Sequence, residues 1–126
     1  MTGHEGEVYT VAFHPDGATL ASCSSDGTVR LWDPSDAQAT HKLTGHKGAV
    51  YTVAFAGHDE LLSASADRTT KVWNVKERKE RWTLPAHKNE VYAVASTPDG
   101  SRWATAGKDH IVRVLTGTLP AGAGGN

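Results

Sequence analysis

The sequence predicts an all-β protein that contains three copies of one four-stranded antiparallel unit. Two observations support this prediction. A short motif that ends in histidine recurs at a nearly constant interval, and its histidines lie 42 and 41 residues apart. Between turn sequences lie short apolar runs rich in Val, Thr, Tyr and Trp, and such runs are typical of strands. The three copies of the motif read Thr2-Gly3-His4, Thr44-Gly45-His46 and Pro85-Ala86-His87.

Two turn sequences organise the first unit. His14-Pro15-Asp16-Gly17 predicts a turn because Pro presets φ, Asp bonds its own backbone and Gly accepts a positive φ. Ser25-Asp26-Gly27 predicts a second tight turn, and Trp32-Asp33 ends the third apolar run. The strands expected in this unit cover residues 8–13, 18–24, 28–33 and 39–43.

The second unit repeats this pattern, whereas the third loses it near its end. The second unit predicts strands at 50–55, 60–65, 69–74 and 80–84, and the third predicts strands at 91–96, 101–106 and 110–115. A fourth strand in the third unit would have to come from 116–121, where Gly117 and Pro120 are poor strand residues, so it is expected to be short or absent. The three units are therefore expected at 2–43, 44–84 and 85–121, followed by a flexible Gly-rich tail at 122–126.

A period of 40–45 residues with a Gly-His start, a Pro-Asp-Gly turn and a Trp-Asp end resembles the WD-repeat family of β-propellers. The third unit departs from the family pattern, because Leu115 stands where the Trp is expected and Ser96 stands where the others have Phe. The resemblance implies that each unit is one blade of a propeller. The chain would then form three four-stranded antiparallel propeller blades, which make up a partial β-propeller arc.

The resemblance also implies a hydrogen-bonded set of side chains in each blade, made of a His, a Ser or Thr, the turn Asp and the Trp. Ser, His and Asp can also form a nucleophilic triad. A set that recurs in every blade is interpreted as structural, so no catalytic residue and no enzyme activity are predicted. The sets are His4, Ser22, Asp26 and Trp32 in the first blade, His46, Ser63, Asp67 and Trp73 in the second, and His87, Thr105 and Asp109 in the third, which is truncated.

The composition excludes several other classes of protein. Lys and Arg number 13 against 14 Asp and Glu, so the chain lacks the basic excess of nucleic-acid-binding proteins. No signal peptide or membrane-spanning stretch is evident and Cys23 is the only cysteine, so a cytoplasmic protein without a membrane partner is expected. The histidines that open the units lie in separate blades and cannot share a metal ion, so neither a metal nor a cofactor is predicted.

Three blades are fewer than the roughly 4–8 of a closed propeller, so an isolated arc would expose two apolar faces. Either the chain associates with itself or it is a piece of a longer propeller. Head-to-tail self-association favours a dimer with six blades, and a trimer with nine blades comes second. Residues 1–43 carry two basic and six acidic side chains and residues 85–126 carry four basic and three acidic ones, which favours contact between these units slightly.

The function predicted from the resemblance is a non-enzymatic scaffold that binds proteins or peptides. All three tyrosines occupy the same position at the start of a unit. Tyrosine is frequent in binding hot spots, although packing between the units is an equally good interpretation. The alternative is a purely structural propeller fragment, engineered or duplicated, whose only activity is self-assembly. The candidate binding face comprises Tyr9, Tyr51, Tyr92, Glu5, Glu7, Lys47, Lys88, Glu90 and Lys108.

Overall fold

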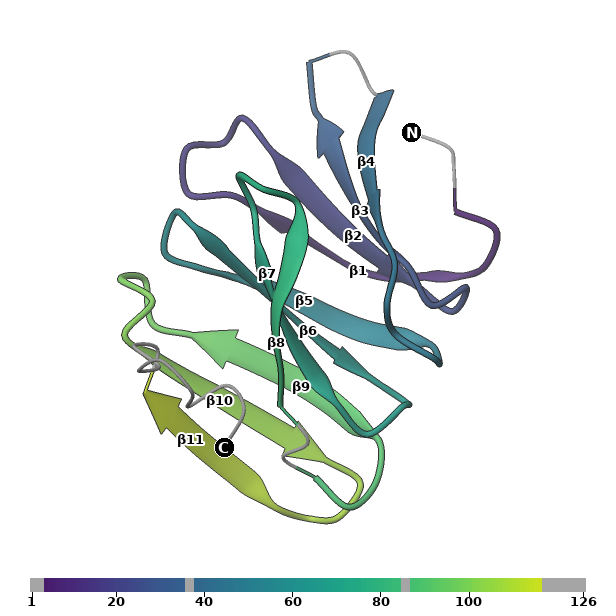
Figure 1. Cartoon of the computed structure of the whole chain (residues 1–126), viewed down its shortest axis with the longest axis vertical. Helices are drawn as coiled ribbons and strands as arrows, with labels where there is room; N and C mark the ends of the chain where they lie inside the picture. The colour runs from purple at the N-terminus through teal and green to yellow at the C-terminus, as the bar shows by residue number, and fades with distance from the viewer. Residues whose placement is uncertain (1–3, 36–37, 85–86, 117–126) are drawn as a thin grey trace.

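The computed structural model describes residues 4–35, 38–84 and 87–116. Within these residues the chain forms eleven strands and no helix, so it contains no helix that could cross a membrane. The strands form three antiparallel sheets, each made of strands consecutive in sequence. Figure 1 shows the sheets side by side, with the N-terminal sheet at one end and the C-terminal sheet at the other. The prediction of an all-β chain with three blade-like sheets is confirmed.

The strand bounds lie within a few residues of the predicted ones. The first sheet contains β1 (Val8–Phe13), β2 (Leu20–Ser24), β3 (Val29–Asp33) and β4 (Gln38–Leu43). The second contains β5 (Val50–Ala56), β6 (Glu60–Ser65), β7 (Thr70–Asn74) and β8 (Lys79–Leu84). The third contains β9 (Val91–Ser96), β10 (Arg102–Gly107) and β11 (Val112–Thr116).

The end of the third unit lies mostly outside the described residues. Thr116 is the last residue of β11, so the short or absent strand expected at 116–121 is otherwise not covered, and neither is the tail expected at 122–126. The unit boundaries at 2–43, 44–84 and 85–121 remain a prediction.

Two hydrophobic cores lie between the sheets. The first joins one face of the first sheet to the facing side of the second, and the second core does the same for the second and third sheets. Burying apolar side chains between sheets is the main stabilisation available to such a fold. The first core contains Ala21, Cys23, Val29, Leu31, Leu43, Val50, Val53, Leu61 and Trp73. The second contains Ala56, Leu62, Val72, Leu84 and Trp103.

Candidate functional site

The three tyrosines form a continuous row across the first strands of the sheets, β1, β5 and β9. The ring centroids of Tyr9 and Tyr51 are 5.6 Å apart, and those of Tyr51 and Tyr92 are 5.2 Å apart. These distances are those of direct aromatic contact. Tyr9 and Tyr92 are 44% and 45% exposed, whereas Tyr51 is half-buried between them. The tyrosine row, Tyr9, Tyr51 and Tyr92, is therefore one aromatic surface that is open to solvent.

A β-bulge positions every tyrosine of the row. In the first sheet Val8 pairs with Ser24 and Thr10 pairs with Cys23, so Tyr9 has no partner across the strand pair. The same register shift skips Tyr51 in the second sheet and Tyr92 in the third. A bulge turns one side chain out of the regular alternation, and bulges are common beside functional sites.

Two hydrogen bonds hold the middle of the row. The Tyr51 hydroxyl donates to Glu90 Oε1 at 3.1 Å, and Thr10 Oγ1 donates to the carbonyl of Tyr51 at 2.9 Å. Burial and the neighbouring Glu90 carboxylate raise the pKa of the Tyr51 phenol. The phenol therefore remains a hydrogen-bond donor at neutral pH.

The other charged residues of the candidate face surround the row without forming one cluster. The side chains of Glu5, Lys47 and Lys88 are exposed, and their backbone N–H groups donate to the turn carboxylates at 2.9 to 3.1 Å. Glu7 and Lys108 are also exposed. Among the hydrogen bonds of the described residues, only Glu90 reaches a tyrosine hydroxyl.

The predicted side-chain set of the second blade is joined by hydrogen bonds. His46 Nε2 lies 2.6 Å from Ser63 Oγ, and His46 Nδ1 lies 2.8 Å from Asp67 Oδ2. The Trp73 indole donates to Ser63 Oγ at 2.8 Å. Because Trp73 uses an acceptor site of Ser63, the serine hydroxyl can donate to Nε2, and the Nδ1–H group then donates to Asp67.

The first and third blades contain the same arrangement with two differences. His4, Ser22, Asp26 and Trp32 repeat it with distances of 2.6 to 3.3 Å. In the third blade His87 reaches Thr105 at 2.8 Å and Asp109 at 2.9 Å, and no indole joins them. The indole of Trp103 donates instead to the Gly100 carbonyl at 3.1 Å.

One member of this set was missed from the sequence. Thr28 Oγ1 donates to Asp26 at 2.6 Å, and Thr69 Oγ1 donates to Asp67 at 2.5 Å. The signal was present as a threonine two residues after the turn Asp in the first two units, whereas the third unit has Ile111 there. The carboxylate of the third blade therefore lacks this hydroxyl donor.

The arrangement resembles a nucleophilic triad, but its accessibility does not suit catalysis. Ser63 is 0% exposed and the Trp73 indole covers its oxygen, so a substrate cannot approach the hydroxyl in this conformation. Burial also raises the pKa of the Cys23 thiol to about 11, which keeps it neutral within the first core. Across the described residues no group of three or more His, Cys, Asp or Glu side chains is placed to hold a metal ion.

The networks make stability dependent on pH. Burial alone would raise the pKa of Asp67, but hydrogen bonds from Thr69, His46 and the Lys47 backbone lower it to about 2. A carboxyl with a lowered pKa in the folded state contributes stability above its unfolded pKa of about 3.9, and that contribution is lost as the pH falls towards 2. Burial lowers the pKa of His46, so its neutral form is also favoured on folding and stability falls below about pH 6.5.

We therefore expect the free energy of unfolding to decrease steadily from pH 7 to pH 3, because both groups act in the same direction. Urea denaturation at a series of pH values measures this decrease. In the Asp67→Asn variant the decrease below pH 4 should be smaller, since one titrating carboxyl is gone. If the free energy of unfolding of that variant decreased below pH 4 as much as that of the wild type, Asp67 would not be the group responsible.

Comparison with known proteins agrees with the repeat pattern. The family model described as WD domain, G-beta repeat matches residues 1–33, 37–74 and 78–115. A 36-residue segment is 50% identical to a probable cytosolic iron-sulfur protein assembly protein, Ciao1, of Anopheles gambiae, and covers 29% of this chain and 11% of that protein. A 37-residue segment is 54% identical to Striatin-4 of Homo sapiens, and covers 29% of this chain and 5% of that protein.

A third similarity has the same extent. A 33-residue segment is 54% identical to the U5 small nuclear ribonucleoprotein 40 kDa protein of Homo sapiens, and covers 26% of this chain and 9% of that protein. Each match is thus about the length of one repeat and spans a small fraction of the relative.

Proposed function

Because the chain belongs to the WD40 family of WD domain, G-beta repeat proteins, we propose that it is a non-enzymatic scaffold that binds a protein or peptide across the tyrosine row. The contact between the three rings is the observation that carries this proposal. Tyrosine offers a large apolar surface together with a hydroxyl, and it is enriched at the centres of binding interfaces. The row presents apolar ring surface and hydroxyl groups to solvent on the first strands of neighbouring blades.

The charges around the row suit a ligand of mixed charge. Glu5 and Glu7 lie at the first blade, and Lys47, Lys88 and Lys108 at the other two. These side chains are exposed and can adapt to a partner, whereas the hydrogen bond from Tyr51 to Glu90 holds the centre of the row in one orientation. A rigid aromatic centre with an adaptable polar rim is typical of protein-binding surfaces.

Selection of peptides from a random display library on the immobilised protein tests this proposal. Peptides selected on the wild type should bind the Tyr92→Ala variant at least about tenfold more weakly, which corresponds to about 1.4 kcal/mol. Because Tyr92 is 45% exposed, the variant should keep its fold. A matched control is Ile111→Ala, which removes an exposed apolar side chain that is not part of the row. Equal binding to Tyr92→Ala and the wild type would contradict the proposal.

The absence of enzyme activity is part of the proposal and rests on the burial of the hydroxyls. Ser22, Ser63 and Thr105, the hydroxyl-bearing members of the sets, are all buried. Each of these buried hydroxyls bonds a histidine, and in the first two blades also an indole, so the groups satisfy one another and stabilise the sheet.

We further propose that the chain associates with itself head to tail, as a dimer or, second, as a trimer. The apolar faces at the two ends of the arc support this proposal. The alternative function, a structural module that only assembles, would share this association but lack a ligand at the tyrosine row. The peptide selection therefore distinguishes the two, because a module that only assembles should retain no peptide at the row.

A cytoplasmic location and the absence of a nucleic-acid partner remain predictions from the sequence. The near balance of 13 basic and 14 acidic residues supports the second of these.

A further inference from the structure

The first and third sheets each have an outer face that no other sheet covers within the described residues. The leading face of the first sheet is defined here by Val8, Val11 and Phe13, which are 52%, 58% and 63% exposed. Their counterparts in the second sheet are Val50 and Val53, exposed by only 0% and 4%, and the partly buried Phe55. The same three positions are therefore buried or partly buried in the second sheet, which has another sheet in front of it.

The third sheet shows the complementary exposure. Its trailing face is defined here by Ala95, Ala104, Val112 and Val114. Val112 and Val114 are 70% and 69% exposed, whereas Val29 and Leu31 at the corresponding positions of the first sheet are 0% and 2% exposed. One chain thus exposes a leading face at one end and a trailing face at the other. Faces of these two kinds pack against each other twice within the chain, between the first and second sheets and between the second and third.

The internal interface shows what fits the trailing face. In the first sheet, strand pairing aligns Ala12, Ala21 and Leu31 in one row across β1, β2 and β3. Phe55 packs against the core that contains this row, with its ring 5.1 Å from that of His14. A phenylalanine of the following sheet therefore packs beside a row whose middle residue is alanine.

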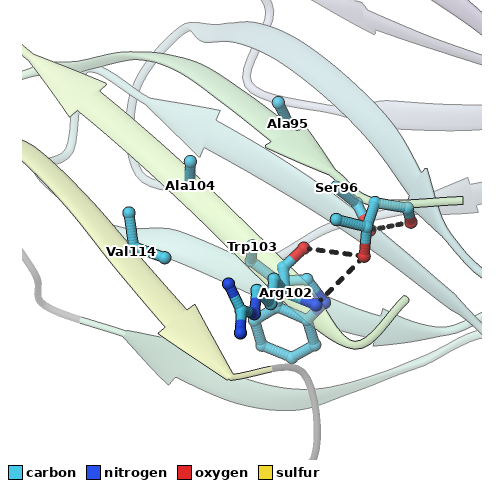
Figure 2. A pocket seen from close by; sticks show the side chains of 7 residues that line it. Ala95, Ser96, Arg102, Trp103, Ala104 and Val114 are labelled. Atoms are coloured by element: carbon cyan, nitrogen blue, oxygen red, sulfur yellow. Dashed lines mark hydrogen bonds between the residues drawn. The ribbon is translucent and has the colours of Figure 1, made fainter. Parts of the chain in front are cut away.

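The third sheet repeats this row with the same small residue in the middle. Pairing aligns Ala95, Ala104 and Val114 across β9, β10 and β11. Figure 2 shows these side chains on adjacent strands, where they line a hollow together with Thr97 and Arg102.

In the second sheet, by contrast, the middle residue of the row is the larger Leu62, and the next sheet has Ser96 where Phe would stand. At each of these two interfaces, a large residue on one sheet thus accompanies a small residue on the sheet that faces it. Ala104 occupies the position that Ala21 occupies in the first sheet, and its small side chain leaves the same space for a phenylalanine.

We propose that the hollow on the trailing face binds Phe13 of a second copy of this chain. This inference rests on the self-association proposed above and names its central contact. Phe13 stands at the position of Phe55, is exposed, and belongs to a strand with the same Val-Tyr-Thr-Val-Ala-Phe sequence. Burying this phenylalanine would remove a large apolar side chain from water at each joint, which favours association.

The turn that follows Phe13 supports the same contact. Gly100, in the β9–β10 turn, lies so close to the second sheet that an added Cβ would come 3.0 Å from the Ala56 backbone and 3.1 Å from the Gly57 nitrogen. Gly17 is its counterpart in the β1–β2 turn, and no atom of the described residues lies within 4 Å of such a Cβ. A second copy docked like an additional sheet would bring its turn at Gly17 against the turn at Thr97 of the first copy.

This docking would also extend the tyrosine row. Neighbouring sheets place their tyrosine rings 5.2 to 5.6 Å apart, so Tyr9 of the second copy would continue the row beyond Tyr92. The ligand face of one chain would therefore be completed by the other. Asp16, in the turn that follows Phe13, and Arg102, which lines the hollow, add charges of opposite sign to the joint.

Sedimentation of the wild-type chain and of two charged variants tests this contact. The wild type should sediment as a dimer at micromolar concentration. Phe13→Asp and Val114→Lys should each be monomeric, because each variant has a charge in both joints of the ring. Both side chains are more than 60% exposed, so the variants should fold, which circular dichroism checks. Ile111→Lys, at an exposed apolar position outside both faces, is the matched control and should keep the wild-type mass.

Mixing the two variants gives the decisive measurement. An equimolar mixture should recover the dimer, because one joint then has wild-type residues and the other brings the carboxylate introduced by Phe13→Asp against the ammonium introduced by Val114→Lys. If two copies associated in any other orientation, mixing the two variants would not restore the dimer in this way. A mixture that stays monomeric, or single variants that stay dimeric, would overturn the assignment of Phe13 to the hollow. A monomeric wild type would overturn self-association itself, and the peptide selection would still test the tyrosine row.

Discussion

Replacing Asp67 by alanine is expected to lower the free energy of unfolding by about 2–4 kcal/mol. Its carboxylate accepts hydrogen bonds from His46, from the Lys47 backbone and from both the backbone and the hydroxyl of Thr69. The alanine variant leaves these donors without an acceptor. His46 has a side chain that is 1% exposed, so its Nδ1–H group would lose its acceptor inside the fold.

The same substitution in the third blade provides the matched comparison. Asp109 accepts from His87 and from the Lys88 and Ile111 backbones, but no threonine hydroxyl and no indole take part in this network. Asp109→Ala should therefore cost less, about 1–2 kcal/mol. Urea denaturation followed by circular dichroism measures both variants. Asp59→Ala, at an exposed position, controls for the loss of a charge. Equal losses at Asp67 and Asp109 would contradict the prediction, because the two networks differ.

The second large effect is expected for Trp73→Ala, at about 3–5 kcal/mol. The indole is 2% exposed and belongs to the core between the first and second sheets. It also donates to Ser63 Oγ at 2.8 Å. The alanine variant therefore loses packing between two sheets, opens a cavity there and removes a hydrogen bond from a buried hydroxyl.

Two variants separate these contributions. Trp73→Phe removes the N–H donor and only part of the volume of the indole, so its cost should be smaller than that of Trp73→Ala, at about 1–2 kcal/mol. Trp32→Ala removes the equivalent residue of the first sheet, which bonds Ser22 but does not belong to the core between the sheets, so its cost should be smaller than that of Trp73→Ala. Thermal and urea unfolding measure all three variants. A larger loss at Trp32 would show that packing between the sheets is not the main contribution of Trp73.

The repeat architecture of this protein could be predicted from local sequence alone. The interval between His4, His46 and His87 encodes one unit three times, and the turn sequences with the alternating apolar runs define the strands within it. The Ser, Asp and Trp members recur with the same repeat, but their grouping into one set came from the resemblance to the WD-repeat family, and the structure joins them by hydrogen bonds. Such features depend on residues close in sequence, whose backbone preferences and spacing can be recognised in the sequence itself.

Other features were decided only by the tertiary structure. The alignment of the tyrosine rings depends on three β-bulges, and a register shift is a property of two paired strands that neither strand reveals by itself. Phe13 and Phe55 stand in identical sequence contexts, yet one is exposed and the other partly buried, because only the second has a sheet in front of it. The sequence by itself thus determined the repeated unit and its strands, whereas the packing of one sheet on the next determined which copies of the same residue are buried and which remain open to a partner.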